Sequence, residues 1–269
     1  MDGVRTRATL TTADGERLAA ELLPGPGVST CVVLAHGFSG STARPALRRV
    51  AQGLARHSAV LAYDARGHGA STGRTTLGDL EVLDVDAAVA FARDRGYGAV
   101  VTCGWSMGGA AVLRHAGLRG AAVAGHRLSW PPDAVVAVST ASRWSVRATA
   151  TGPMRRLHRV VETRSGRAYA RRVMRTRISD AGWDPLPAAP VDLVGRVAPL
   201  PLLLVHGDRD GYFPLEHPHA LASAAGEPCE LWLEHGFAHA ETAASADLLD
   251  RIGRHLPVLL ARGAERRPA

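Results

Sequence analysis

The chain has 269 residues, of which 46% are hydrophobic and 21% are charged, and its formal net charge is +7. This length is enough for one large α/β domain or two small ones, and the composition is typical of a soluble globular protein. No segment approaches the ~20 apolar residues of a membrane span, and residues 1–23 lack the charged-then-apolar order of a secretory signal. We therefore expect a cytoplasmic protein.

Apolar runs alternate with segments of helical spacing along most of the chain. Residues 8–23 are predicted to form a hairpin, because two alternating stretches flank the turn pair Asp14-Gly15. Strands are predicted at residues 31–37, 59–64, 99–105, 134–140, 200–207 and 229–235. Helices are predicted at residues 43–57, 77–96, from 106 onward, at 214–226 with an interruption at Pro218, and at 243–263 with a bend at Pro257. This order predicts parallel βαβ units in a sheet that is covered on both faces.

The cysteines Cys31, Cys103 and Cys229 each lie within one of the apolar runs. An odd number of cysteines in predicted strands favours free thiols over a disulfide framework. Small buried core residues are therefore the expected role of all three.

Ser106 lies in the pentapeptide Gly104-Trp105-Ser106-Met107-Gly108, between a predicted strand and a predicted helix. In this context the pattern predicts a nucleophile on a sharp turn, with its hydroxyl exposed above the sheet. The glycines avoid clashes with the neighbouring strand and helix, and the helix N-terminus offers free N–H groups to a developing negative charge. A glycine turn that merely contains a serine has the same five residues, so the chain must also supply a base, an acid and an oxyanion site.

A serine hydroxyl needs a base that is oriented by a third group. Asp210 follows the fifth of the six apolar strands, and His239 follows the sixth. Catalytic groups of an open α/β sheet gather at such strand ends, which favours Asp210 as the acid and His239 as the base. The alternatives are Asp208 for the acid, and His206 and His235 for the base.

An oxyanion hole needs two aligned backbone donors. One is expected to be the N–H of Met107, directly after the serine, and the other a donor from the loop after an earlier strand. The segment "LAHGFSG" supplies that loop, with the Phe38 N–H as the second donor. His36 is not expected to bind a metal, because no second ligand lies at metal spacing nearby.

Taken together, these motifs resemble the α/β-hydrolase superfamily, in particular its lipase, esterase and serine-aminopeptidase-like branch, which includes the monoacylglycerol-lipase-like proteins. The matching motifs occur in the family's order: "HGF" at 36–38, "YDARGHGAS" at 63–71, "GWSMGG" at 104–109, "HGDRDGYFP" at 206–214 and "GFAHAE" at 236–241. The resemblance implies a mostly parallel sheet of the eight-stranded type. It also implies Asp210 rather than Asp208 as the acid and His239 rather than His235 as the base. Asp64, Arg66 and His68 match a turn that the resemblance implies to be structural.

Residues 141–197 interrupt the alternation, and the resemblance implies a small helical cap there, inserted after the sixth strand of the fold. The predicted organisation is thus a core at 1–140 and 198–269 with a cap at 141–197. Residues 143–177 contain eleven arginines and one acid, Glu162. Two apolar stripes and one arginine face are predicted by their spacing: Met154, Leu157, Val160 and Val161; Tyr169, Val173, Met174 and Ile178; and Arg164, Arg167, Arg171 and Arg175.

Two interpretations of this insertion remain open. In the first, it is a cap with a solvated arginine face. In the second, it is a positive surface that attracts anionic substrates such as acyl carriers or lipid head groups, and this second interpretation includes peripheral contact with a membrane. Gly166 either separates two helices or weakens one. Little aromatic interleaving and no recognised module argue against nucleic acid. The apolar stripe of the cap, with Trp130, Trp144 and Trp183, is a candidate lining for an acyl pocket.

The sequence predicts a serine hydrolase that cleaves carboxylic esters through Ser106, His239 and Asp210, with the N–H groups of Phe38 and Met107 as the oxyanion donors. No metal or organic cofactor is expected. A thioesterase or acyltransferase that acts on a carrier-bound acyl group is the alternative. An aminopeptidase-like amide hydrolase and a non-catalytic binding module are further alternatives.

Overall fold

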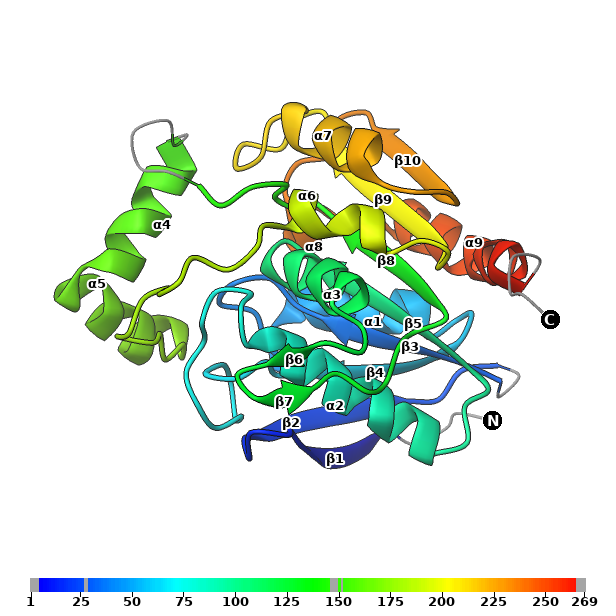
Figure 1. The fold of residues 1–269 in the computed structure, drawn as a ribbon, viewed down its shortest axis with the longest axis horizontal. Coiled ribbons are helices and arrows are strands. Elements are labelled where there is room, and N and C mark those ends of the chain that lie inside the picture. The colour runs from blue at the N-terminus through cyan, green and yellow to red at the C-terminus, as the bar shows by residue number, and fades with distance from the viewer. Residues whose placement is uncertain (1–4, 27–28, 146–149, 151, 265–269) are drawn as a thin grey trace.

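The computed structural model describes residues 5–26, 29–145, 150 and 152–264. An eight-stranded sheet runs through the molecule in the order β1-β2-β4-β3-β5-β8-β9-β10 (Figure 1). Its strands are β1 Thr6–Thr11, β2 Arg17–Leu23, β3 Thr30–Ala35, β4 Ala59–Tyr63, β5 Ala99–Trp105, β8 Ala134–Val138, β9 Leu202–Gly207 and β10 Cys229–Glu234. The β1–β2 and β2–β4 pairs are antiparallel and the others are parallel. The predicted mostly parallel sheet and its hairpin are confirmed.

Helices cover both faces of the sheet (Figure 1). On one face, buried side chains of α2 (Glu81–Asp94), α3 (Met107–Gly117) and α7 (Glu216–Ala224) join the core. On the other face, α1 (Pro45–Leu54) and α9 (Ala246–Ala264) supply the second core. Residues of β3 alternate between these cores, with Val33 in the first and Val32 and Leu34 in the second. A strand that is buried on both faces has no polar side to alternate with, which explains the continuous apolar runs.

Two prolines lie within the bounds of helices, one in a first turn and one in an interior. Pro218 is the third residue of α7, where the missing N–H has no helical acceptor to lose, so the helix is continuous and the predicted interruption is wrong. Pro257 lies inside α9. The short elements that the sequence analysis did not predict are β6 (Ala122–Val123), β7 (His126–Arg127), α6 (Pro190–Leu193), η3 (Val194–Arg196) and α8 (Ala240–Ala243). None of the helices in the described part of the chain is long and apolar enough to cross a membrane.

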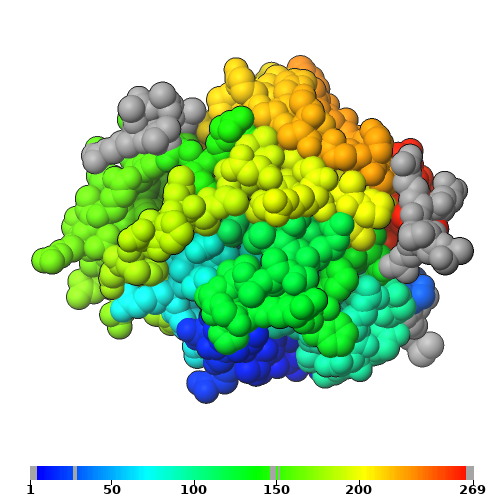
Figure 2. All heavy atoms as spheres, in the orientation of Figure 1, coloured from blue at the N-terminus to red at the C-terminus, as the bar shows by residue number. Residues whose placement is uncertain are grey.

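The arginine-rich segment forms α4 (Gly152–Glu162), α5 (Arg164–Tyr169) and the π-helical turn η2 (Ala170–Met174). These elements project as a lobe beyond one end of the sheet (Figures 1 and 2). The break between α4 and α5 lies at Thr163, whose Oγ1 accepts the Gly166 N–H at 3.0 Å. Gly166 is therefore inside α5 and does not separate the helices. Residues 146–149 and 151 of the predicted cap lie outside the described residues.

The second predicted apolar stripe of the insertion is wrong in part. Ile178 is buried, but Tyr169 is 52% exposed and Val173 is 58% exposed. The predicted arginine face also ends early, because Arg175 follows η2 in a left-handed conformation with φ 55°. For Val173 and Arg175 the physical reason is the π-helical turn, which adds a residue to the turn and moves these side chains off the face that α-helical spacing predicts.

Candidate active site

Ser106 stands between the end of β5 and the start of α3, with φ 53° and ψ −114°. A Cβ on Gly104 would lie 2.2 Å from the Gly108 carbonyl oxygen, and a Cβ on Gly108 would lie 2.3 Å from the Ala35 carbonyl oxygen. Side chains at these two positions would therefore collide with backbone. The glycines allow the chain to turn sharply, and the turn places the serine above the sheet.

The three residues predicted as catalytic lie in one line of hydrogen bonds. The Ser106 hydroxyl is 2.9 Å from Nε2 of His239, and Nδ1 of His239 is 2.7 Å from Oδ2 of Asp210. The Asp210 side chain is fully buried, whereas 19% of the His239 side chain is exposed. The arrangement matches the nucleophile, base and orienting acid that nucleophilic serine chemistry requires.

The Asp210 carboxylate is held by backbone as well as by His239. Its Oδ1 accepts the N–H groups of Tyr212 at 2.8 Å and Phe213 at 3.0 Å. Burial alone would raise the pKa of Asp210, but the hydrogen bond and charge of His239 and these backbone N–H groups keep the pKa below its ordinary value. Asp210 is thus ionised at neutral pH and fixes the proton of His239 on Nδ1.

The residues that the sequence offered as an alternative acid or base lie outside this chain of hydrogen bonds. Asp208 Oδ2 is 2.7 Å from Nδ1 of His235, whose side chain is 90% exposed, so these two rivals pair with each other at the surface. His206 is buried beneath the acid, and its Nε2 donates to the Phe213 carbonyl oxygen at 2.8 Å. Within the part of the chain that the structure describes, none of these three residues forms a hydrogen bond with Ser106, whose partner is His239.

The loop at residues 36–40 lies beside the nucleophile. A Cβ on Gly37 would be 3.2 Å from Cβ of Ser106. Within the described part of the chain, the backbone N–H groups of Phe38 and Met107 donate to no protein acceptor. Two unoccupied N–H groups next to a serine hydroxyl are the feature an oxyanion hole needs.

Two buried histidines hold this loop through their unprotonated nitrogens. Nε2 of His36 accepts the Ala65 N–H at 3.0 Å, and Nε2 of His68 accepts the Ser39 N–H at 3.2 Å. Both rings are therefore neutral with the proton on Nδ1. Burial, with the nearby His36, lowers the pKa of His68 to about 3. His68 belongs to the turn that the sequence analysis assigned to the scaffold.

Arg66 in the same turn has a structural role. Its Nε is 2.8 Å from Oδ1 of Asp84, and its Nη1 is 2.7 Å from Oδ2 of Asp14. The ion pairs join the β1–β2 turn to α2, away from the serine. Asp64 accepts the Thr42 and Ala70 N–H groups and likewise holds backbone.

Three residues that contact the site, Tyr212, Phe213 and Glu241, were not predicted from the sequence. The Tyr212 and Phe213 rings pack on His239 with centroid distances of 4.4 and 5.4 Å. Glu241 accepts the Gly37 N–H on Oε1 at 2.6 Å. The signal for each in the sequence is proximity to Asp210 or His239, which does not tell what the side chain contacts.

Helix α4 reaches the site through these aromatic residues. Met154 of α4 is buried in a cluster with Phe213 and Ala150, and Leu157 and Tyr212 pack against it. One side of the predicted stripe on α4 therefore lies next to the residues that flank His239. By contrast, the Trp144 and Trp183 rings contact each other in a tilted arrangement, with centroids 4.7 Å apart. Their Nε1 groups donate to the Pro187 and Thr76 carbonyl oxygens, so these residues fasten the chain on either side of the lobe.

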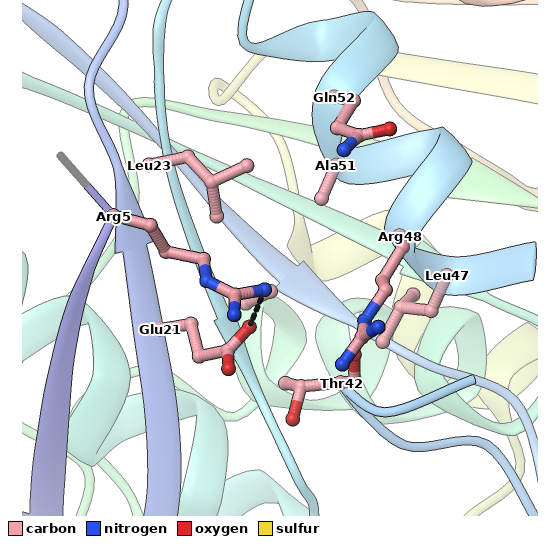
Figure 3. Close-up of a pocket in the computed structure, with 9 residues that line it drawn as sticks. Arg5, Glu21, Leu23, Thr42, Leu47, Arg48, Ala51 and Gln52 are labelled. Atoms are coloured by element: carbon pink, nitrogen blue, oxygen red, sulfur yellow. Dashed lines mark hydrogen bonds and ion pairs between the residues drawn. The ribbon is translucent and has the colours of Figure 1, made fainter. Parts of the chain in front are cut away.

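Two hollows on the surface lie away from the triad residues. One is lined by Arg5, Glu21, Thr42 and Arg48, and Figure 3 shows Arg5 turned toward Glu21 and Arg48 toward Thr42. The other follows β1 and the start of α1, with a volume of about 840 Å³. Neither is lined by Ser106, Asp210 or His239.

The cysteines take no part in this geometry. The thiols of Cys31, Cys103 and Cys229 are free, and burial raises the pKa of the Cys103 thiol to about 12, which makes it inert three residues before Ser106. Among the described residues, no group of three or more histidines, cysteines or acids is arranged to hold a metal ion.

The eight-stranded sheet with a serine elbow after β5 has the architecture of the α/β hydrolases. The model of the alpha/beta hydrolase family matches residues 32–248, and the chain belongs to this family. The predicted superfamily is thus confirmed, and its proposed lipase- and aminopeptidase-like branch stays a prediction. No curated protein sequence matches the chain.

Solved structures share the fold over nearly the whole chain. The esterase Pf2001 of Pyrococcus furiosus is 21% identical with a TM-score of 0.69, covering 96% of this chain and 93% of that chain. The α/β hydrolase GrgF from Penicillium sp. sh18 is 18% identical with a TM-score of 0.71, covering 97% and 100%. Est1E from Butyrivibrio proteoclasticus, solved with ferulic acid, is 20% identical with a TM-score of 0.63, covering 94% and 99%.

Proposed function

We propose that this protein is a serine hydrolase that cleaves carboxylic esters through a covalent acyl-enzyme. The observation that carries the proposal is the line from the Ser106 hydroxyl through His239 to the buried Asp210 carboxylate. Pf2001, which shares the fold, is an esterase, and this supports the same class of reaction here.

In the first half-reaction, Ser106 Oγ attacks the ester carbonyl carbon while Nε2 of His239 takes the serine proton. Asp210 stabilises the imidazolium that results and keeps its ring oriented. The carbonyl oxygen becomes an oxyanion that accepts from the N–H groups of Phe38 and Met107. The tetrahedral intermediate collapses when His239 gives its proton to the leaving alcohol.

In the second half-reaction, water attacks the acyl-enzyme. His239 takes a proton from this water, a second oxyanion forms at the same two N–H groups, and collapse releases the carboxylic acid and returns the proton to Ser106. Residues 36–40, which carry the Phe38 donor, form the oxyanion loop. No step requires a metal or an organic cofactor.

The acyl group is proposed to lie against the inner side of α4. Met154 and Leu157 belong to the cluster that includes the aromatic residues packed on His239, so an acyl chain on Ser106 would meet apolar surface there. This assigns the predicted cap a role in substrate binding, with residues 141–197 as the segment to exchange in a specificity test.

A thioesterase that acts on a carrier-bound acyl group is the second candidate. The observation in its favour is the exposed arginines of the lobe, Arg164, Arg171, Arg172 and Arg175, because phosphate on a carrier is attracted to such a surface. Hydrolysis of matched esters and thioesters with and without a phosphorylated carrier separates the two candidates. A preference of kcat/KM for the carrier-bound thioester that is lost on raising the salt concentration would favour the second.

The proposal is tested with Ser106→Ala on short p-nitrophenyl esters and with a fluorophosphonate label. Ser145→Ala is the matched control, because Ser145 Oγ also lies 3.1 Å from a histidine nitrogen, Nε2 of His158, and Nδ1 of His158 lies 2.6 Å from Oε1 of Glu162. That second arrangement joins Ser145 to α4 and does not lie at a strand end. We expect loss of turnover and labelling in Ser106→Ala alone; turnover that persists in Ser106→Ala would refute the mechanism.

A further inference from the structure

We propose that Glu241 is a positioning residue that holds the oxyanion loop in its active geometry. The inference rests on the proposed function and adds to it a residue that does not touch the substrate. The observation behind it is the hydrogen bond from the Gly37 N–H to Oε1 of Glu241, at 2.6 Å, between residues that are 204 positions apart.

A strained turn lies between His239 and Glu241 and directs their side chains to different residues. Ala240 between them has φ 52°, a left-handed conformation that costs free energy for a residue with a Cβ. Its N–H donates to Oγ of Ser139 at 3.1 Å, which holds the turn against the end of β8. With Ala240 in this conformation, His239 reaches Ser106 and Glu241 reaches Gly37.

The bond to Glu241 completes the support of Gly37, because the peptide groups on both sides of this residue are then held. The Gly37 carbonyl oxygen accepts from Nδ1 of His36 at 2.7 Å and from the Gly40 N–H at 2.9 Å. In a trans peptide the next N–H points away from that carbonyl, so the Phe38 N–H is directed away from these donors and stays free. With its N–H on Glu241 and its carbonyl oxygen on two donors, Gly37 cannot rotate without losing hydrogen bonds.

The carboxylate acts where the loop comes nearest to the nucleophile. A Cβ on Gly37 would lie 3.2 Å from Cβ of Ser106 and 3.3 Å from Oε2 of Glu241. A small shift of Gly37 therefore moves the Phe38 N–H relative to Ser106. Because an oxyanion donor acts only at hydrogen-bond distance, a displacement of about 1 Å is enough to weaken catalysis strongly.

A carboxylate suits this task better than a neutral group. Its bond to a backbone N–H is charge-assisted, shorter and about twice as strong as a neutral one. Glu241 is partly buried, so water competes less for it than at the open surface. The same turn therefore presents the base to the serine and fixes the oxyanion loop, which links the two halves of the catalytic geometry.

The test compares Glu241→Gln with Glu241→Met. The glutamine keeps a carbonyl acceptor for the Gly37 N–H, whereas the methionine keeps similar length and volume without an oxygen. Glu216→Ala, which removes an exposed carboxylate from the first turn of α7, is the control. The measurements are kcat and KM on a short p-nitrophenyl ester, the inhibition constant of an alkyl boronic acid, and the thermal unfolding midpoint.

We expect kcat of Glu241→Met to fall about 10- to 100-fold with little change in KM, because the loop acts on the transition state rather than on ground-state binding. The boronic acid forms a tetrahedral adduct on Ser106, so its affinity should fall by a similar factor. Glu241→Gln should recover most of kcat and of boronate affinity, and Glu216→Ala should match the wild type.

Two kinetic results would overturn the positioning role: a wild-type kcat in Glu241→Met, or an equal loss of kcat in the glutamine and methionine variants. A third result would also overturn it. If the methionine variant fails to fold while the glutamine variant folds, Glu241 contributes to stability alone. Ser106→Ala reports separately on the proposed function. If that variant is inactive while Glu241→Met is unchanged, only the positioning role fails; if Ser106→Ala retains turnover, the proposed function itself fails.

Discussion

Replacing Asp210 by asparagine tests the proposed catalytic line with the least change of shape. Oδ1 of Asp210 accepts two backbone N–H groups, and Oδ2 faces Nδ1 of His239. An asparagine there keeps its carbonyl oxygen on the two N–H donors, because an NH₂ group facing them would leave buried donors unpaired. Its NH₂ group then faces His239.

The exchange of an acceptor for a donor opposite Nδ1 moves the proton of His239 to its other ring nitrogen. Nδ1 of His239 becomes the acceptor for the asparagine NH₂ group, so the neutral ring carries its proton on Nε2, which faces Ser106. Nε2 can then no longer take the serine proton. We expect kcat to fall by about 10³- to 10⁴-fold, which corresponds to about 4 to 5.5 kcal/mol of transition-state stabilisation.

The assay is steady-state hydrolysis of p-nitrophenyl acetate at pH 7, together with the thermal unfolding midpoint to verify folding. Asp208→Asn is the matched control, since Asp208 is two residues away and pairs with the exposed His235. We expect this control to keep wild-type activity. The reasoning is refuted if Asp210→Asn retains more than about a tenth of kcat, or if Asp208→Asn loses as much as Asp210→Asn.

Three further predictions concern the support of the site. Gly108→Ala should lower the free energy of unfolding in urea by about 3 kcal/mol, because its Cβ would meet the Ala35 carbonyl group. Gly152→Ala, which has open space around its Cβ, should leave this free energy unchanged, and equal losses in the two variants would contradict the prediction. His68 has a native pKa of about 3 against 6.5, so below pH 6.5 the unfolded chain binds a proton that the native state does not. Stability should fall as pH decreases through that window, by about 1.4 kcal/mol per pH unit from this residue, and His68→Gln should flatten the slope between pH 6.5 and 5; an unchanged slope would exclude His68. Arg66→Met should cost about 3 to 5 kcal/mol because it removes the cationic partner of the buried Asp84 carboxylate, and adding Asp84→Asn should restore part of the loss in the same urea titration.

Local patterns in the sequence were sufficient for the strands, the main helices and the serine elbow. Strand and helix periodicity depend on neighbouring residues, and the elbow needs small residues within two positions of Ser106, so both are visible in a short window. The choice between Asp208 and Asp210 is not local. It came from the resemblance to a family, and the structure separates the two by placing Asp208 on His235 and Asp210 on His239.

The tertiary structure decided which distant groups meet. The bond between Gly37 and Glu241 is one example, because β5, β8 and β9 separate β3 from β10 in the sheet. The two residues meet only because the segment after β10 crosses back over the strand ends, where it also contacts Ser139 and Ser106. Likewise, helical spacing alone assigned Val173 to a packed stripe, whereas this residue lies in the π-helical turn at Ala170–Met174 and its side chain is exposed. Periodicity in a sequence describes residues that are close along the chain and assumes regular helices and strands. The contacts that orient a catalytic loop depend instead on the order of strands in the sheet and on local departures from regular geometry, which only the folded chain contains.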